Sequence, residues 1–400
     1  MLLNSIKLLN FRNYNEQQFT FNKSFNYIYG NNGEGKTNVL EAISYISFGK
    51  SFLNSSESDC VKFNSSGFNV EGVYENDVRT EYNVYLNYDS VSKKKTFHLN
   101  KEKVRRWTSE IFGRFPIVSL SPHSLEITYG NPSERRKFFD ILLAQTSRVY
   151  FDFLSSYVRI LKQKNALLKN QINGNAIPAN EFRTLLTSIN EKMADYSGEI
   201  LRRRFDLLKM FSGYFQRSFS YLIDKDDEPG IKYFSSYLDA DKITADGNAE
   251  VKIDELKKLF LINLETRMNE EIARGVSVTG IHKDDYLFSL SKKVNGDEKR
   301  NFELKNFASQ GEHKTFVIAL KLAEYHFLKD NLQNSPVLLL DDLLSELDST
   351  RVSKIVSHLK EYGQIFLTTT SKDYADDLKD FYESNEIEYF QIENGRVIGR

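Results

Sequence analysis

The feature that most constrains this chain is the stretch Gly30–Thr37, which reads GNNGEGKT. It matches the pattern G-x-x-x-x-G-K-[ST] without a mismatch. The apolar run FNYIY precedes it, and NVLEAISYISFG follows with apolar residues at helical spacing. A strand, a glycine-rich loop and a helix in this order let backbone N–H groups and a helix N-terminus face a phosphate. The stretch therefore predicts a nucleotide-binding site on an α/β fold.

The side chains of this loop have expected roles. Lys36 should reach the β- and γ-phosphates of the nucleotide, and the Thr37 hydroxyl should coordinate a magnesium ion. Lys36 is also expected to stabilise negative charge on the phosphates during phosphoryl transfer, so we count it as catalytic. The residues expected to contact the nucleotide here are Gly30, Asn31, Asn32, Gly33, Glu34, Gly35, Lys36, Thr37 and Asn38.

A second, acidic motif ends an apolar run far along the chain. The run PVLLLDD closes with Asp341 and Asp342, and Asp341 lies 305 positions (341 − 36) after Lys36. At the carboxyl end of a buried strand, Asp341 is expected to hold magnesium, and Asp342 to orient or deprotonate an attacking water. Small P-loop kinases and GTPases keep the two motifs closer, so the spacing predicts a large insertion between them.

The pattern of apolar residues divides the chain into three parts. Residues 68–99 alternate with the period of strands, whereas residues 133–171 and 181–215 read as two long helices around the break at 173–180. Residues 251–275 read as a further helix that ends in glycine. We therefore predict an N-terminal ATPase part over 1–130, a mainly helical lobe over 131–275 and a C-terminal ATPase part over 276–400.

Composition narrows the class of protein. The chain has 400 residues, of which 40% are hydrophobic and 27% charged, an ordinary balance for a soluble globular protein. It contains no run of about 18 apolar residues, which predicts no membrane span. The single cysteine, Cys60, cannot form an internal disulfide, which favours a reducing, cytoplasmic location. The formal charge of −1 leaves polyanion binding to local patches.

A serine–glycine helix start precedes the acidic motif. Ser309, Gln310, Gly311 and Glu312 open the amphipathic run HKTFVIALKLAEY. In isolation an N-cap explains them. This helix start comes before PVLLLDD, and SELD follows at 345–348. An ABC-type ATPase has its signature helix, acidic strand and D-loop in this order. In that class the signature helix of one subunit caps the γ-phosphate bound by another. Ser309, Gln310, Gly311 and Asp348 therefore join the residues expected to bind nucleotide.

Six stretches make the chain resemble the RecF family of bacterial DNA replication and repair proteins. They are LLNFRNY, GNNGEGKTNVLEAI, SPHSLEITYGNPSERRKFFD, RGVSVTGIHKDD, FASQGEHKTFVIALKLAE and LLLDDLLSELD, and the resemblance extends over residues 1–370. It implies an α/β fold, namely an ABC-type ATPase head with a P-loop core and an inserted helical lobe. Arg12 in FRNY resembles the N-terminal arginine that approaches the nucleotide in related heads.

The resemblance also implies an activity. ATP and Mg²⁺ would be the cofactors, and two heads would close around two ATP molecules to form a homodimer. That dimer would clamp DNA at gaps or junctions without reading sequence, and slow ATP hydrolysis would open it. RecR and RecO would be partners in helping to load the recombinase RecA.

Four positions depart from the usual family pattern. Ile281 and Lys283 stand where the family has proline and arginine, Glu312 stands for glutamine, and His123 stands for an acidic residue. The switch histidine of ABC ATPases has no counterpart in TTTS at 368–371, so hydroxyl groups would take over its work.

Clusters of basic residues are the candidates for DNA contact. Each reads either as a solvated surface or as a phosphate-binding patch, and the arginines at 135 and 136 also fit a structural ion pair because they lie in a family-specific block. The clusters are Lys93–Lys95, Lys101, Lys103, Arg105, Arg106, Arg135–Lys137 and Arg202–Arg204.

Other classes of protein share parts of this pattern. An ABC-type ATPase subunit of another complex, such as a transporter, would carry the same phosphate motifs and signature helix. The long helical insertion and the two family-specific blocks disfavour it. A phosphotransferase would need an acceptor site, and a nuclease would need acidic metal clusters beyond Asp284 and Asp285.

Overall fold

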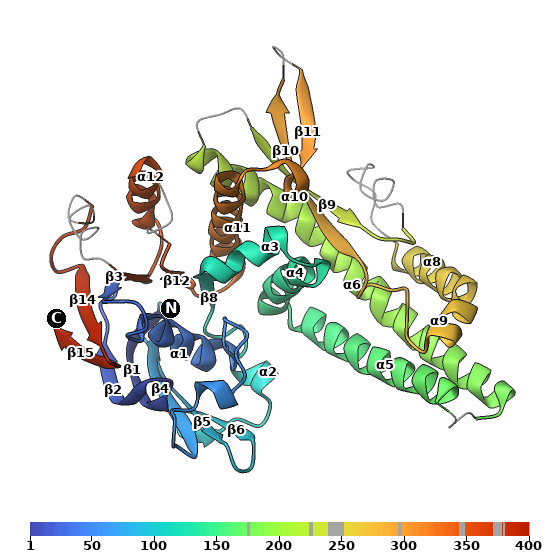
Figure 1. Cartoon of the computed structure of the whole chain (residues 1–400), viewed down its shortest axis with the longest axis horizontal. Coiled ribbons are helices and arrows are strands. Elements are labelled where there is room, and N and C mark those ends of the chain that lie inside the picture. The colour runs from blue at the N-terminus through green and yellow to red at the C-terminus, as the bar shows by residue number, and fades with distance from the viewer. Residues whose placement is uncertain are drawn as a thin grey trace. The chain divides into compact units, whose positions relative to one another are not determined.

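The computed structural model contains two compact units, shown in one view in Figure 1. The first comprises residues 1–125, 217–224 and 314–400, and the second comprises 126–216 and 225–313. The structure describes residues 1–173, 177–223, 227–238, 252–294, 298–343, 349–370, 378 and 381–399; of residues 109 and 349–353 it describes the backbone alone.

An antiparallel sheet forms one half of the first unit. Its strand order is β2-β1-β4-β5-β6-β7, and along β4 every second residue is buried, as expected for a sheet with one covered face. The strands are β1 (Leu2–Phe11), β2 (Tyr14–Thr20), β4 (Gly67–Glu75), β5 (Glu81–Asp89), β6 (Lys94–Leu99) and β7 (Glu102–Lys103).

A second, mainly parallel sheet carries the two phosphate motifs. Its order is β15-β14-β3-β13-β12-β8, with only β15 antiparallel to its neighbour. All five residues of β12 and of β13 are buried, which fits parallel strands covered on both faces. The strands are β3 (Phe25–Tyr29), β8 (Ile117–Leu120), β12 (Val337–Asp341), β13 (Ile365–Thr369), β14 (Ile387–Glu393) and β15 (Arg396–Gly399).

Helix α1 (Lys36–Phe48) joins the two sheets into one core. Val39, Ile43 and Ile46 of α1 belong to the same buried cluster as residues of β1 and β4 on one sheet and of β12 and β13 on the other. Because β3, β12 and β13 are parallel neighbours, their carboxyl ends meet at one edge of the sheet. The other helices that begin in this unit are η1 (Ser58–Cys60), α2 (Trp107–Glu110), η2 (Pro122–Leu125) and α12 (Ser349–Leu359).

The second unit is mainly helical, with one small antiparallel sheet of order β11-β10-β9. Its strands are β9 (Glu228–Phe234), β10 (Asp285–Lys293) and β11 (Lys299–Glu303). The remaining helices of the described chain are α3 (Glu126–Tyr129), α4 (Pro132–Thr146), α5 (Arg148–Ile172), α6 (Ala179–Leu222), α8 (Ile253–Thr266), α9 (Met268–Arg274), α10 (Leu304–Phe307) and α11 (Gln310–Asn331).

Two helices predicted as continuous are divided in the structure. The prediction of one helix over 133–171 was wrong, because Ser147 has extended backbone angles (φ −138°, ψ 102°) and separates α4 from α5. Its hydroxyl accepts a hydrogen bond of 3.2 Å from the N–H of Tyr150, so the serine is the N-cap of α5. The helix predicted over 251–275 is likewise divided, at Arg267, and ends at Gly275 in the left-handed conformation.

The two units differ from the three predicted lobes mainly at residues 276–313, and also at residues 126–130, which belong to the second unit, and 217–224, which belong to the first. Residues 276–313, which the sequence grouped with the C-terminal ATPase part, cluster with the helical unit because β10 pairs with both β9 and β11. The lobes over 1–130, 131–275 and 276–400 stay a prediction about folding domains. Within the described residues, no helix is both long and apolar enough to cross a membrane.

Candidate nucleotide-binding site

Two glycines in the loop after β3 occupy positions that no larger residue fits. Gly30 has φ 152°, and a Cβ there would lie 2.3 Å from the carbonyl oxygen of Ile392. Gly35 has φ 113° and is the N-cap of α1; a Cβ there would lie 2.6 Å from the side chain of Asn13. The loop is therefore packed tightly at both ends, and glycine is required by space as well as by conformation.

Residues from outside the loop hold its backbone in place. The Asn13 amide donates to the Glu34 carbonyl oxygen at 2.7 Å, and the Tyr14 hydroxyl donates to the Gly35 carbonyl oxygen at 3.0 Å. The N–H of Gly395 also donates to the Glu34 carbonyl oxygen, at 3.0 Å. Sequence reasoning missed these supporting residues. The motif FRNY contains Asn13 and Tyr14, so attention to it beyond Arg12 would have found two of them.

The Lys36 side chain is folded onto the loop. Its ammonium donates to the carbonyl oxygens of Gly30 and Asn31, at 2.8 Å each. Burial lowers the pKa of Lys36, while the carboxylates of Asp342 and Asp341 act to raise it. The cation is thus placed where the loop backbone curls, and a bound phosphate would replace the two carbonyl oxygens as its partner.

Asp341 is the centre of the second motif and meets Thr37 directly. Its Oδ1 atom accepts hydrogen bonds of 2.7 Å from the Thr37 hydroxyl and of 2.7 Å from the Thr368 hydroxyl. Burial raises the pKa of Asp341, and these two hydroxyl groups act to lower it. The hydroxyl of Thr37 and the carboxylate of Asp341, expected from sequence to share a metal, therefore lie in contact.

Thr368 also fixes the residue that follows Asp341. Asp342 has a left-handed backbone conformation (φ 50°), and its N–H donates to both the carbonyl and the hydroxyl oxygen of Thr368, at 3.1 Å each. Because β12 and β13 pair in parallel with Asp341 opposite Thr368, one threonine supports both aspartates. The hydroxyl group expected to replace the switch histidine is thus bonded to the acidic motif.

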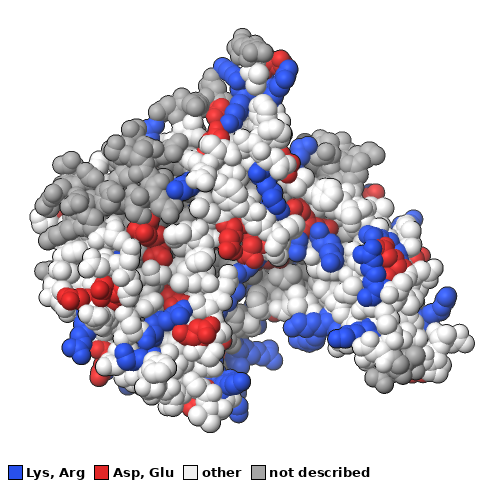
Figure 2. All heavy atoms as spheres, viewed as in Figure 1, with Lys and Arg blue, Asp and Glu red and all other residues white. Residues whose placement is uncertain are grey.

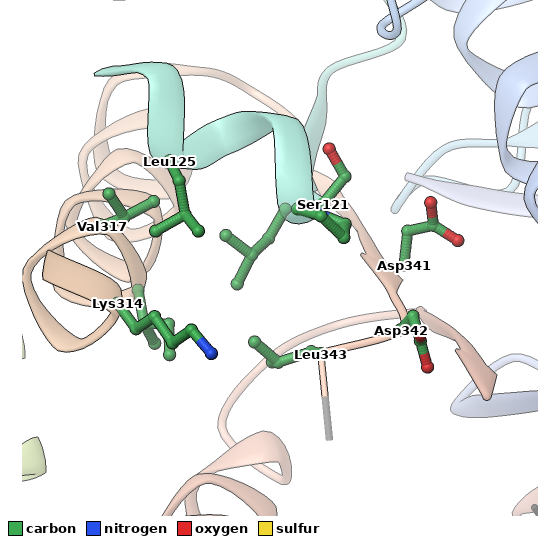
Figure 3. Close-up of a pocket in the computed structure, with 10 residues that line it drawn as sticks. Ser121, Leu125, Lys314, Val317, Asp341, Asp342 and Leu343 are labelled. Atoms are coloured by element: carbon green, nitrogen blue, oxygen red, sulfur yellow. The ribbon is translucent and has the colours of Figure 1, made fainter. Parts of the chain in front are cut away.

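A small cavity lies beside the two aspartates. Its volume is about 30 Å³, enough for a water molecule. Figure 3 shows Ser121 and Leu125 on one wall, Lys314 and Val317 of α11 on another, and Asp341 and Asp342 at the end of β12. The cavity lies next to Asp342, the residue expected to orient an attacking water.

The oxygen ligands at this edge of the sheet suit magnesium. Mg²⁺ prefers hard oxygen donors and binds through one or two protein ligands plus waters and substrate phosphates. The Thr37 hydroxyl and the Asp341 carboxylate, 2.7 Å apart, provide such a pair. These two side chains would hold the ion, which would supply positive charge at the phosphates of ATP bound to the loop.

Arg12 makes contacts other than those expected. Its guanidinium forms two hydrogen bonds of 2.7 Å with the buried Glu41 carboxylate and further bonds with the Ser55 hydroxyl and the Asp59 carbonyl oxygen. Glu41 lies on α1, so Arg12 ties the end of β1 to the helix that the phosphate loop opens. Its contact with a nucleotide stays a prediction.

The predicted signature residues start helix α11 in the second unit. The Ser309 hydroxyl accepts from the Glu312 N–H at 3.3 Å, and the Glu312 carboxylate accepts from the Ser309 N–H at 2.8 Å, which is a reciprocal capping box. Glu312 also forms an ion pair with Lys292. This cation neutralises the carboxylate that replaces the family glutamine. Gln310 and Gly311 lie in the first turn, and Asp348 lies outside the described residues.

The two family-specific blocks meet in the second unit. Arg135 forms a bidentate ion pair with Asp285, at 2.7 and 2.9 Å, and the Arg136 guanidinium donates to the Asp284 carbonyl oxygen. Arg204 is 1% exposed and pairs with Asp140 at 2.8 Å. The ion pair offered as the alternative for Arg135 is therefore present, whereas for Arg204 the structure corrects the hypothesis of a DNA-contacting cluster, because its side chain is buried.

Three features define an ATPase head of the ABC type: a phosphate loop after β3, a carboxylate at the end of β12, which lies two strands from β3 in the same parallel sheet, and a large helical insertion. The family model described as RecF/RecN/SMC N terminal domain matches residues 2–388. The chain belongs to the RecF family of DNA replication and repair proteins, as its motifs predicted.

Individual relatives match over nearly their whole length. The DNA replication and repair protein RecF of Chloroherpeton thalassium is 36% identical over 379 residues, which cover 94% of this chain and 97% of that protein. RecF of Phocaeicola vulgatus is 33% identical over an alignment that covers 100% of this chain and 99% of that protein. A solved structure of the recombination mediator protein RecF with ATP in the RecFOR pathway is 30% identical, with a TM-score of 0.81 over 98% of this chain and 96% of that chain. The predicted fold class is confirmed.

Proposed function

We propose that this chain is an ATP-dependent DNA-binding clamp that acts in recombinational gap repair and in the maintenance of replication. The observation that carries the proposal is the contact between the Thr37 hydroxyl and the Asp341 carboxylate, 2.7 Å apart, beside a complete phosphate loop. Membership of the RecF family, and the similarity to a solved RecF described with ATP, support ATP as the nucleotide.

In the proposed cycle, ATP drives association of two copies. Lys36 and Thr37 of one copy bind the triphosphate, and Ser309, Gln310 and Gly311 of the other copy cap its γ-phosphate, with Asp348 beside them. The capping box fixes the conformation of the first turn of α11, and the positive end of the helix dipole there favours an anion. ATP favours the dimer only through the contacts that it gains in the closed state.

Hydrolysis opens the clamp in this scheme. A water oriented by Asp342 attacks the γ-phosphorus and passes a proton to the Asp342 carboxylate, while the bond from the γ-phosphorus to the bridging oxygen breaks and ADP leaves. Thr37 and Asp341 would hold a magnesium ion, which would supply positive charge at the phosphates. Lys36 stabilises the same charge. Thr368 holds both aspartates in position through its hydroxyl.

The closed dimer would encircle or grip DNA through its phosphates without reading sequence, since no base-reading motif is found in the chain. RecR and RecO are the proposed protein partners in assisting RecA loading, because a solved relative is described within the RecFOR pathway. A cytoplasmic location follows from the proposed DNA substrate.

The test is ATP hydrolysis measured with and without gapped DNA. We expect DNA to raise the rate, and we expect Asp342→Asn to abolish hydrolysis while ATP-dependent DNA binding persists. The matched control is Asp330→Asn, an acidic residue at the end of α11 that lies outside the site. The proposed clamp would be contradicted if the hydrolysis rate were the same with and without DNA and no ATP-dependent DNA binding were found.

A further inference from the structure

Helix α5 presents a row of basic side chains on its exposed face. Arg148, Arg159, Lys162 and Lys169 are all exposed, and at 100° per residue they fall within an arc of about 80° on the helix. We call these four residues the α5 stripe. The opposite face carries the buried Tyr157, Lys164 and Leu168, so the helix separates a packed face from a basic one.

The charges of the α5 stripe are mostly unneutralised. Asp152 is the only acidic residue of α5, and it is paired with Arg148 at 3.7 Å with both side chains at least half exposed. Arg159, Lys162 and Lys169 form no ion pair with any residue that the structure describes. A further basic residue of the helix, Lys164, is buried against Glu271 and so does not contribute to the surface.

Most residues between these cations are small or polar. Ser155, Gln163, Ala166 and Asn170 lie on the same side of α5, together with the half-buried Phe151 and, at the edge of the arc, Val158, which is 41% exposed. Figure 2 shows blue Lys and Arg side chains along the lower border of the region that Figure 1 labels α5. The surface is therefore mainly basic and hydrophilic, with Phe151 as its one aromatic side chain.

The dimensions of the α5 stripe suit a nucleic-acid backbone. From position 148 to position 169 an α-helix rises about 32 Å, close to the 34 Å of one turn of B-DNA. Phosphates along a duplex carry one negative charge for about every 1.7 Å of axis, so each of the four cations can meet a phosphate without distortion of the helix. Serine, glutamine and asparagine also donate to phosphate oxygens.

We propose that the α5 stripe is a DNA-binding surface that contacts the phosphate backbone of duplex DNA. The proposal rests on the proposed function, because it assigns part of the clamp's DNA contact to the helical unit. None of the basic clusters noted in the sequence includes these residues, since their spacing of 11, 3 and 7 positions is visible as a row only on a helix.

The experiment compares full-length native protein with the triple variant Arg159→Gln, Lys162→Gln, Lys169→Gln. Glutamine keeps helix propensity, so far-UV circular dichroism should be unchanged. Binding to a fluorescent 40-base-pair duplex is measured by anisotropy, with and without ATP, over a range of salt. A matched control changes three other exposed cations of the same unit, Arg183→Gln, Lys192→Gln and Lys258→Gln, with the same change in net charge.

We expect the stripe variant to lower the slope of log K against log salt by about 2.7, and the affinity at 0.1 M salt by roughly 100-fold or more. The control should change affinity by less than about threefold, and the charge-preserving variant Arg159→Lys, Lys162→Arg, Lys169→Arg should bind like the native chain. ATP binding, which uses the first unit, should be unchanged in all three variants.

Two results would overturn the inference while the proposed function stands. In one, the native chain binds DNA and the stripe variant binds equally well with the same salt slope. In the other, the control loses as much affinity as the stripe variant, so that only net charge matters. If the native chain binds no DNA in either nucleotide state, the proposed function fails and the inference fails with it.

Discussion

The substitution Asp284→Asn should stabilise the protein at neutral pH, although Asp284 belongs to a family-specific block. The side chain is 1% exposed; one carboxylate oxygen accepts from the Tyr233 hydroxyl at 2.6 Å, and Oδ1 has no hydrogen-bond partner among the described residues. Burial raises the pKa of Asp284 to about 6, against an ordinary value of 3.8. Folding therefore favours the protonated acid, and the ionised form costs stability.

The size and sign of the effect follow from the linkage of protonation to folding. A folded-state pKa of about 6 and an unfolded value of 3.8 correspond to a cost of about 3 kcal/mol above pH 7, which falls to about 1 kcal/mol at pH 4.5 and vanishes at lower pH. Asparagine removes this cost but leaves a buried amide N–H unpaired, at about 1–2 kcal/mol. The net gain at pH 7.5 is thus about 1–2 kcal/mol.

Urea unfolding at pH 7.5 and pH 4.5 measures both quantities. The variant's gain in unfolding free energy over the native chain should be about 2 kcal/mol smaller at pH 4.5 than at pH 7.5. The cost of the unpaired amide does not depend on pH, so it does not affect this difference. The neighbouring Asp285→Asn is the control with the opposite sign. It breaks a buried bidentate pair with Arg135 and should destabilise by about 3–5 kcal/mol. A less stable Asp284→Asn at pH 7.5, with no dependence on pH, would refute this reasoning.

Two further substitutions test the nucleotide site. Lys36→Ala removes the cation that the loop carbonyls hold, and calorimetry should detect no tight ATP binding while circular dichroism is unchanged; retained affinity would contradict the role of the loop. Thr368→Val removes the hydroxyl that bonds Asp341 and Asp342, so the Mg²⁺ concentration needed for ATP binding should rise roughly tenfold, whereas Thr368→Ser should match the native chain. If the Thr368→Val variant needed the same Mg²⁺ concentration as the native chain, this positioning role of Thr368 would be excluded.

Features carried by short contiguous motifs were predictable from the sequence. The phosphate loop, its helix and the acidic strand each depend on a few neighbouring residues, so Lys36, Thr37 and Asp341 could be named with their expected roles. Their meeting at one point required only the rule that parallel strands end at the same edge of a sheet.

Features that depend on strand pairing or long-range contact were not predictable. Thr368 reaches Asp341 because β13 lies beside β12, and no spacing in the sequence indicates that contact. Asn13 reaches Glu34 because β1 and β2 bring their turn to the loop; the motif FRNY marks Asn13 as a candidate but does not indicate its partner. Periodicity alone also concealed Ser147, since the apolar pattern continues through it while its hydroxyl caps a new helix.

Burial separated arginines that look alike in the sequence. Arg135 and Arg204 stand in dense basic clusters, yet each is held inside the second unit by a carboxylate. The cations of the α5 stripe are scattered along the sequence and yet share one exposed helical face. Local charge density therefore did not distinguish these two buried arginines from cluster members such as Lys93, Lys101 and Arg105, which are exposed.

The central claim is that ATP joins two copies through the loop of one and the signature helix of the other. Light scattering should measure the mass of the native chain and of Ser309→Arg, each with and without ATP, alongside ATP binding by calorimetry. We expect the native chain to change from monomer to dimer only with ATP, and Ser309→Arg to bind ATP but stay a monomer. An ATP-dependent dimer of Ser309→Arg, or a native chain that stays monomeric with ATP and DNA together, would contradict the account.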